Sequence, residues 1–196
     1  MEDLNILRDK AYQNAVAHGW HDKEYSNEHW LCLVMSELME AVEADRKNRY
    51  AKRNFFIYSI DYALRELHLT EKDLNNYFRN TFNDNIKDTV EDELADACIR
   101  LFDYAAVREI DLDEFVYEDG KVLRFYEKSF TESIYRICSY VAEIMNEDEP
   151  YIFLNEIFSF CREREIDIMW HIEQKMKYNE LRPYMHGNKA YMDLKN

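Results

Sequence analysis

Apolar residues recur at intervals of three and four along most of this chain, which is the spacing of an α-helix with one buried face. The pattern predicts a first helix over residues 3–18, which Gly19 would end. Residues 50–82 show the same spacing with many Tyr and Phe side chains, and Thr70 is placed to begin a second short helix there. Three more helices are predicted later in the chain, at residues 130–146, 151–164 and 167–181.

Two further stretches combine helical spacing with paired acids. They are residues 28–48, with Glu37 and Glu40, and residues 86–109, with Glu93 and Asp96. Residues three apart lie about 60° apart around a helix, so each pair faces one side. Apolar residues surround the first pair in most directions, which predicts that its helix lies inside a bundle.

The four paired acids are candidate metal ligands. A carboxylate inside a bundle must be protonated, paired with a cation or bound to a metal ion. Four carboxylates from two helices supply hard oxygen ligands, which suit Mg²⁺ or Mn²⁺ better than zinc. The alternative is that all four are solvated side chains on helix surfaces. The repetition of the pair in two apolar settings favours the metal site.

Local signals also predict where these helices begin. Ser26 or Asn27 is expected to cap the first acidic helix, and Asp84 or Asp88 the second. An Asp-Gly turn signal between two aromatic pieces predicts a small β-hairpin at 115–127.

Composition and charge narrow the class of protein. The 196 residues suit one compact domain, and only 3 Gly and 2 Pro favour long helices, so we expect an all-α fold. The net charge of −15 repels polyanions, which argues against a nucleic acid polymer or an acidic membrane as partner. A nucleotide remains possible if metal ions neutralise it. No apolar run approaches the ~20 residues of a membrane span, and the N-terminus lacks a signal peptide, so a soluble cytoplasmic protein is expected.

A short internal echo links the two halves of the chain. The sequence RLFDYAAVREID at 100–111 is similar to EIFSFCREREID at 156–167. In this register Glu93 aligns with Glu149 but Asp96 aligns with Ile152. The second half is therefore interpreted as a related helix pair that has lost part of the acidic site. A chance match between two helix ends is the alternative.

On its acidic motifs the chain resembles the MazG-like, all-α nucleoside triphosphate pyrophosphohydrolase superfamily, which includes the dimeric dUTPases. The family pattern is E-E-x-x-E on one helix and E-x-x-D on a later one. Here the patterns read S-E-L-M-E at 36–40, with Ser36 in place of the first Glu, and E-L-A-D at 93–96. Glu43 or Asp92 could supply the missing acid.

The C-terminal stretch adds to the resemblance. KMKYNELRPYMHGNKAY at 175–191 is similar to the family tail K-x-x-Y-N-x-x-R-x-x-x-H-G-K, with Asn188 as an extra residue. The resemblance implies a MazG-like bundle with a four-helix core, in which 50–82 is an insertion and 130–191 a degenerate helix pair with a basic tail. It also implies hydrolysis of a nucleoside triphosphate to the monophosphate and pyrophosphate, in a house-cleaning or regulatory role. Members of this family are usually oligomeric, so we expect a homodimer.

The resemblance assigns roles to individual residues. Glu37, Glu40, Glu93 and Asp96 would hold Mg²⁺, or Mn²⁺, and form the catalytic site, with Glu40 as the candidate for orienting the attacking water. The tail would supply cations and a base contact, through Lys175, Arg182 and Lys189 on the phosphates and Asn179 on the base or sugar. Trp30, Trp20 or His21 could stack on the base, and core packing is the alternative for each Trp.

The acidic helices allow two alternative interpretations. A di-iron carboxylate bundle needs E-x-x-H on two helices. None of the 6 His residues has a Glu three positions before it, which excludes that pattern. A non-catalytic nucleotide-binding or scaffold bundle derived from the same family remains the alternative, because the first family Glu is absent.

Overall fold

The computed structural model describes residues 3–112, 128–144 and 150–183, and within these ranges the chain forms eight α-helices and no β-strand. The all-α fold class expected from the sequence is confirmed. The hairpin predicted at 115–127 and the candidate ligand Lys189 lie outside the described residues. The helices are α1 (Leu4–Ala17), α2 (Asn27–Arg46), α3 (Arg53–Glu66), α4 (Glu71–Asn85), α5 (Val90–Val107), α6 (Phe130–Ile144), α7 (Pro150–Glu163) and α8 (Ile168–Glu180).

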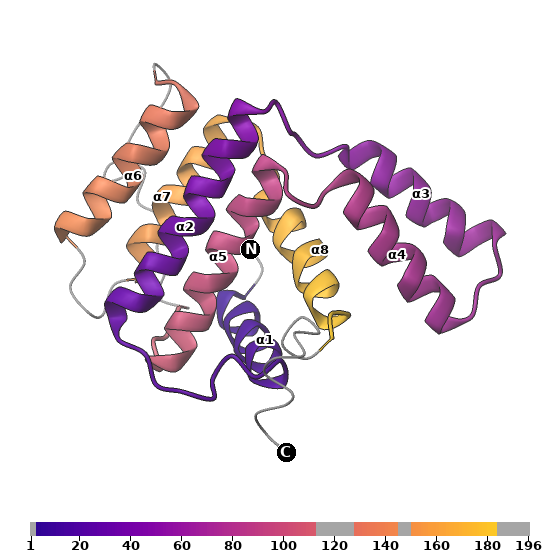
Figure 1. The fold of residues 1–196 in the computed structure, drawn as a ribbon, viewed down its shortest axis with the longest axis horizontal. Helices are drawn as coiled ribbons and strands as arrows, with labels where there is room; N and C mark the ends of the chain where they lie inside the picture. Colours follow the sequence, from indigo (N-terminus) through magenta and orange to yellow (C-terminus); the bar gives the residue numbers. More distant parts are fainter. Residues whose placement is uncertain (1–2, 113–127, 145–149, 184–196) are drawn as a thin grey trace.

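Helix α5 lies at the centre of the bundle and packs against α1, α2, α7 and α8 (Figure 1). Its side chains Leu94, Cys98, Leu101 and Phe102 are fully buried. Helix α2 buries one face against α5, whereas Met39 on its other side is 47% exposed. The expectation that the first acidic helix is enclosed in most directions is therefore wrong. The second acidic helix, α5, holds the enclosed position, and α2 covers it.

Three local signals in the sequence are confirmed at helix ends. Helix α1 ends at Ala17, and Gly19 follows with a φ of 80°, a conformation that glycine adopts without strain. The hydroxyl of Ser26 accepts a hydrogen bond from the main chain of α2, and that of Thr70 does the same for α4. Each hydroxyl satisfies one of the N–H groups that a helix leaves unpaired at its first turn.

The cap of α5 differs from the prediction. Thr89 is the N-cap, and its hydroxyl accepts a hydrogen bond from the Asp92 N–H at 3.4 Å. Asp84 lies in the last turn of α4, and Asp88 has a φ of 58°. The expectation that Asp84 or Asp88 caps this helix is wrong, because the chain turns sharply at Asp88 and only Thr89 has the extended backbone of an N-cap.

The internal echo corresponds to two helix ends with the same geometry. In the repeated R-E-I-D, Glu109 follows α5 with a φ of 55° and Glu165 follows α7 with a φ of 58°. The next residue closes the end each time, since the N–H of Ile110 and that of Ile166 each donate to a helix carbonyl at 2.9 Å. Both isoleucines then pack against the main core. The repeated R-E-I-D sequence thus ends both helices with the same backbone geometry, whether or not the two halves share an ancestor.

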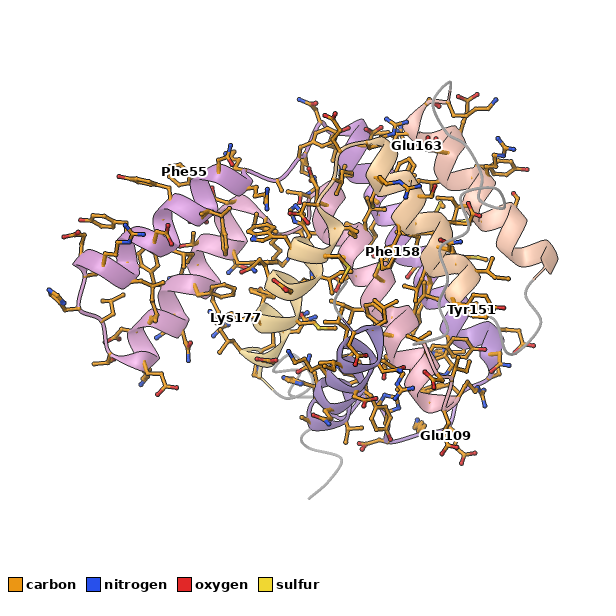
Figure 2. The ribbon with its side chains drawn as sticks, turned by 180° about the vertical axis from the view of Figure 1, so that it is seen from behind. Phe55, Glu109, Tyr151, Phe158, Glu163 and Lys177 are labelled. Carbon is orange, nitrogen blue, oxygen red and sulfur yellow. The ribbon has the colours of Figure 1, made fainter. Side chains whose placement is uncertain are left out.

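Helices α3 and α4 form a hairpin that projects from one side of the bundle (Figure 1). Phe56, Phe78 and Phe82 form a second hydrophobic cluster, which Tyr178 of α8 joins. The outer side of α3 remains apolar and exposed, and Phe55 is 61% exposed there (Figure 2). Residues 50–82 cover most of this hairpin, and their interpretation as an insertion stays a prediction.

Candidate functional site

Three of the four predicted acids come together between α2 and α5. Glu37 of α2 and Glu93 and Asp96 of α5 each offer a carboxylate oxygen, and these oxygens all lie within 4.8 Å of one another. We call these three residues the acid cluster. Glu37 is 8% exposed and Glu93 is 5% exposed, so two of the three acids are buried. The helical spacing of Glu93 and Asp96 turns both toward α2, which packs alongside.

Glu40 lies outside the acid cluster. It is one turn beyond Glu37 on α2 and its side chain is exposed. Its negative charge still contributes to raising the pKa of Glu37 and that of Glu93, which places it within electrostatic range of both. This position suits a carboxylate that faces the solvent side of the cluster rather than one that closes it.

The two candidates for the missing family acid differ in position. Ser36 is exposed and its hydroxyl donates to its own helix, at the Leu33 carbonyl. Glu43 is partly exposed and pairs with Lys47 at 2.8 Å. Asp92, in contrast, is buried beside the cluster and forms a second acidic group with Asp88 and Glu93.

Burial gives the cluster unusual acid–base properties. Desolvation, followed by the charges of Asp92 and Asp96, raises the pKa of Glu93 to about 8. Desolvation and Asp96 also raise the pKa of Glu37, although the charge of Arg100 opposes them. These carboxylates ionise only at a cost in free energy, which a bound cation would offset.

Lys175 of α8 lies among the acids. Its ammonium nitrogen is 2.8 Å from Asp92 Oδ1 and 2.7 Å from Asp96 Oδ2, and the residue is 4% exposed. The resemblance implied that Lys175, Arg182 and Lys189 bind the phosphates and that Asn179 contacts the base or sugar. The structure instead places the Lys175 ammonium on two carboxylates, whereas Asn179 lies in the last turn of α8 and Arg182 follows the helix.

A polar cleft begins at Asp96 and runs between α1, α5 and the end of α8. Asn179 and Arg182, which the sequence predicted as substrate ligands, line it together with Asp96. Its volume is about 80 Å³, well below the roughly 300–1,000 Å³ typical of sites for drug-sized ligands. The cleft would therefore take one part of a nucleotide and leave the remainder at the surface.

Arg100 is a residue of this site that the sequence reasoning missed. It lines the cleft, and its Nε donates to Glu37 Oε1 at 3.2 Å. A signal was present, because Arg100 lies four residues beyond Asp96 and seven beyond Glu93, on the same face of the helix. An arginine at that spacing brings a cation to the edge of an acidic site.

The aromatic candidates for base stacking lie in different environments. Trp30 is 4% exposed and stacks on His21 with ring centroids 5.4 Å apart, and its indole N–H has no hydrogen-bond partner among the described residues. His21 in turn hydrogen-bonds Asp103 at 2.8 Å. Trp20 is 37% exposed and lines the polar cleft. Of the three, Trp20 is the one that a ligand in the cleft could reach.

Comparison with known proteins leaves the family open. No family model matches the sequence, and neither the curated proteins nor the solved structures provide a match. Among the described helices, none combines the length and the apolar character that crossing a membrane requires.

Proposed function

We propose that the protein is a Mg²⁺-dependent nucleoside triphosphate pyrophosphohydrolase, which cleaves a (d)NTP to the (d)NMP and pyrophosphate. The observation that carries the proposal is the convergence of Glu37, Glu93 and Asp96 from two helices within 4.8 Å. Three hard carboxylate oxygens at this separation fit Mg²⁺ or Mn²⁺. When bound, the ion would neutralise phosphate oxygens and lower the pKa of a bound water.

The charges around the cluster support a phosphate-bearing substrate. A triphosphate is repelled by a chain of net charge −15 unless local cations and a metal ion receive it. Arg100 and Arg182 line the cleft that begins at Asp96, and guanidinium groups bind phosphate oxygens in pairs of hydrogen bonds. Asn179 beside them offers an amide to the sugar or base. In this proposal the exposed Glu40 orients the attacking water and accepts its proton.

The test is release of pyrophosphate from a panel of ribo- and deoxyribonucleoside triphosphates with Mg²⁺. At least one nucleotide should yield equal amounts of monophosphate and pyrophosphate, and EDTA should stop the reaction. Release of inorganic phosphate in place of pyrophosphate, or no turnover of any nucleotide, would contradict the proposal.

A second candidate is a nucleotide-binding bundle without catalysis. Lys175 favours it, because an internal ammonium already neutralises part of the charge on Asp92 and Asp96. In that case a nucleotide with Mg²⁺ would raise the melting temperature without being cleaved. The same panel, run by thermal shift and by pyrophosphate release, distinguishes the two functions.

We further propose a cytoplasmic homodimer. The exposed apolar side of α3, which includes Phe55 and Tyr58, is a surface that a second copy could cover. Light scattering of the purified protein measures its mass in solution, and a monomer at micromolar concentration would contradict the dimer.

A further inference from the structure

Two acidic groups lie side by side at the start of α5. The acid cluster contains Glu37, Glu93 and Asp96, and the second group contains Asp88, Asp92 and Glu93. Within each group the nearest carboxylate oxygens lie within 4.8 Å of one another, and Glu93 belongs to both. By ligand type alone, the pair of groups would accept two divalent ions.

Lys175 lies where the two groups meet. Its ammonium touches one acid of each, with 2.8 Å to Asp92 Oδ1 and 2.7 Å to Asp96 Oδ2. The ring of Phe82 lies 5.8 Å from the same nitrogen, on α4. Burial lowers the pKa of Lys175, but Asp96 and Asp92 raise it by more, so the side chain remains a cation inside the protein. An ammonium bridging two carboxylates does what a bridging metal ion would do electrostatically.

The second group has few oxygens left for a metal ion. Asp92 Oδ1 binds Lys175, and Asp92 Oδ2 accepts the main-chain N–H of Asp88 at 2.9 Å. The Asp88 carboxylate pairs with Lys87. Each of its two own acids is therefore already engaged within the protein.

The acid cluster keeps free oxygens. The Glu93 carboxylate makes no hydrogen bond or ion pair with any side chain in the described part of the chain. Asp96 uses Oδ2 on Lys175, and Glu37 uses Oε1 on Arg100. Counting contacts with the described side chains, one oxygen of Glu37, one of Asp96 and both of Glu93 are left, which is enough to hold a single ion that completes its shell with water.

From this asymmetry we infer that the site binds one divalent ion, at the acid cluster, and that Lys175 is a built-in cation in the position where a second ion would bridge Asp92 and Asp96. The inference rests on the proposed function only for the existence of the metal site. Lys175 is then a positioning residue that holds Asp96 toward the cluster, and it does not reach the substrate.

Mn²⁺ is the probe, because free Mn²⁺ can be counted by electron paramagnetic resonance without nucleotide. The wild-type chain should bind one Mn²⁺. Lys175→Met should bind two, because Asp92 and Asp96 are released and uncompensated. Lys177→Met is the matched control, since Lys177 is on the same helix, exposed, and over the ring of Phe78 (Figure 2). It should bind one. Two ions in the wild type, or one in folded Lys175→Met, would overturn the inference.

Lys175→Met leaves the charge of Asp92 buried and unpaired, which can unfold the protein. The double variant Lys175→Met with Asp92→Asn removes both charges and keeps the acid cluster. It should bind one Mn²⁺ about tenfold more tightly than the wild type, because Asp96 no longer shares its charge with an ammonium. An unchanged or weaker affinity would refute the role given to Lys175.

The count also separates this inference from the proposed function. One Mn²⁺ per wild-type chain, with no pyrophosphate released from any nucleotide, would contradict the proposed enzymatic activity and support the inference about Lys175. Two ions with active hydrolysis would do the reverse. No bound Mn²⁺ would overturn the inference and the metal site together.

Discussion

The guanidinium of Arg100 on α5 donates a hydrogen bond to the Glu37 carboxylate on α2, with 3.2 Å between Nε and Oε1. The contact joins the two helices that carry the acid cluster. It engages one of the two oxygens of Glu37. Burial and Asp96 raise the pKa of Glu37, and the charge of Arg100 opposes them, so this arginine favours the ionised form that a metal ion needs.

Arg100→Gln should therefore weaken metal binding. Partners that orient a metal ligand contribute about 10- to 100-fold in affinity, and the lower half of that range fits a contact whose arginine is 36% exposed in its side chain. Titration with Mn²⁺ measures the loss. Arg46→Gln is the control, because Arg46 is exposed on α2 and its ion pair among the described residues is with Glu43, outside the acid cluster. Equal affinities of both variants would show that the contact does not orient Glu37.

Glu37 and Glu40 should separate metal binding from turnover. Glu37→Gln removes a member of the acid cluster, so it should lose Mn²⁺ binding and more than about 100-fold of the pyrophosphate release. Glu40→Gln leaves the cluster whole, so it should keep one Mn²⁺ and lose about 10²–10⁴-fold in kcat, as expected for a residue that handles a proton. Circular dichroism establishes that both variants fold. Loss of Mn²⁺ by Glu40→Gln would make Glu40 a ligand instead.

Stability of the metal-free protein should fall as pH rises above neutrality. The pKa of Glu93 is about 8 in the folded chain and near 4.5 when unfolded, so the folded state holds a proton that the unfolded state has released. Stability is then lost as pH rises, up to the folded pKa. His171 works in the opposite direction, because burial lowers its pKa from 6.5 to about 4 and its effect ends near 6.5. The pKa of Asp92 is raised to about 6, so the stability that its protonation contributes is already nearly lost at pH 6.5.

The pH range in which Glu93 acts without opposition from His171 thus lies between 6.5 and about 8. Thermal melts in EDTA should show a falling melting temperature across it, and Glu93→Gln should flatten the decline. Excess Mg²⁺ should restore the wild type most at the upper end, since the ion replaces the proton. A melting temperature that rises through this window in EDTA would contradict the raised pKa of Glu93.

The period of apolar residues predicted most of the fold, because helical spacing is a local property of the sequence. The helix predicted at 130–146 forms over Phe130–Ile144, and the one at 151–164 over Pro150–Glu163. Caps with one candidate, such as Thr70, were also predictable. At α5 the choice depended on the backbone at Asp88, which turns with a positive φ that side-chain chemistry alone did not indicate.

The site was predictable in its acids and less so in its cations. Glu37, Glu93 and Asp96 share a helix face by spacing, so only the pairing of α2 with α5 had to follow. The partners of Lys175 depend on how α8 packs on α5, and one of them, Asp92, is 83 positions away in the sequence. From sequence alone, a lysine in a basic stretch is predicted to be a phosphate ligand, because the packing that pairs it with two acids is not visible there.

Arg182 and Asn179 should affect substrate binding more than turnover. Both line the cleft next to Asp96, and Arg182 keeps only a 3.5 Å contact with Asn179 among charged or amide side chains in the described ranges. Arg182→Gln should raise the KM of the preferred nucleotide by about tenfold, the effect of one charge-assisted hydrogen bond, with kcat within about twofold. Lys177→Gln serves as the control. A fall in kcat with unchanged KM would place Arg182 in the chemical step.

Phe82 should connect the stability of the hairpin to the acid cluster. Its ring stacks on Tyr178 of α8, with centroids 4.4 Å apart, and lies near the Lys175 ammonium. The side chain is fully buried, so Phe82→Ala should lower the free energy of unfolding by about 3–5 kcal/mol. Phe55→Ala, on the exposed side of α3, should change it by less than about 0.5 kcal/mol.

Urea denaturation measures both variants, and it should be repeated with saturating Mn²⁺. Loss of Phe82 frees the Lys175 side chain to leave Asp96, so Mn²⁺ should stabilise Phe82→Ala by more than it stabilises the wild type. If the hairpin unfolds alone, two transitions should appear, with the first insensitive to Mn²⁺. A single transition with equal metal stabilisation in both proteins would mean that the hairpin and the acid cluster are independent, despite the shared contact with Lys175.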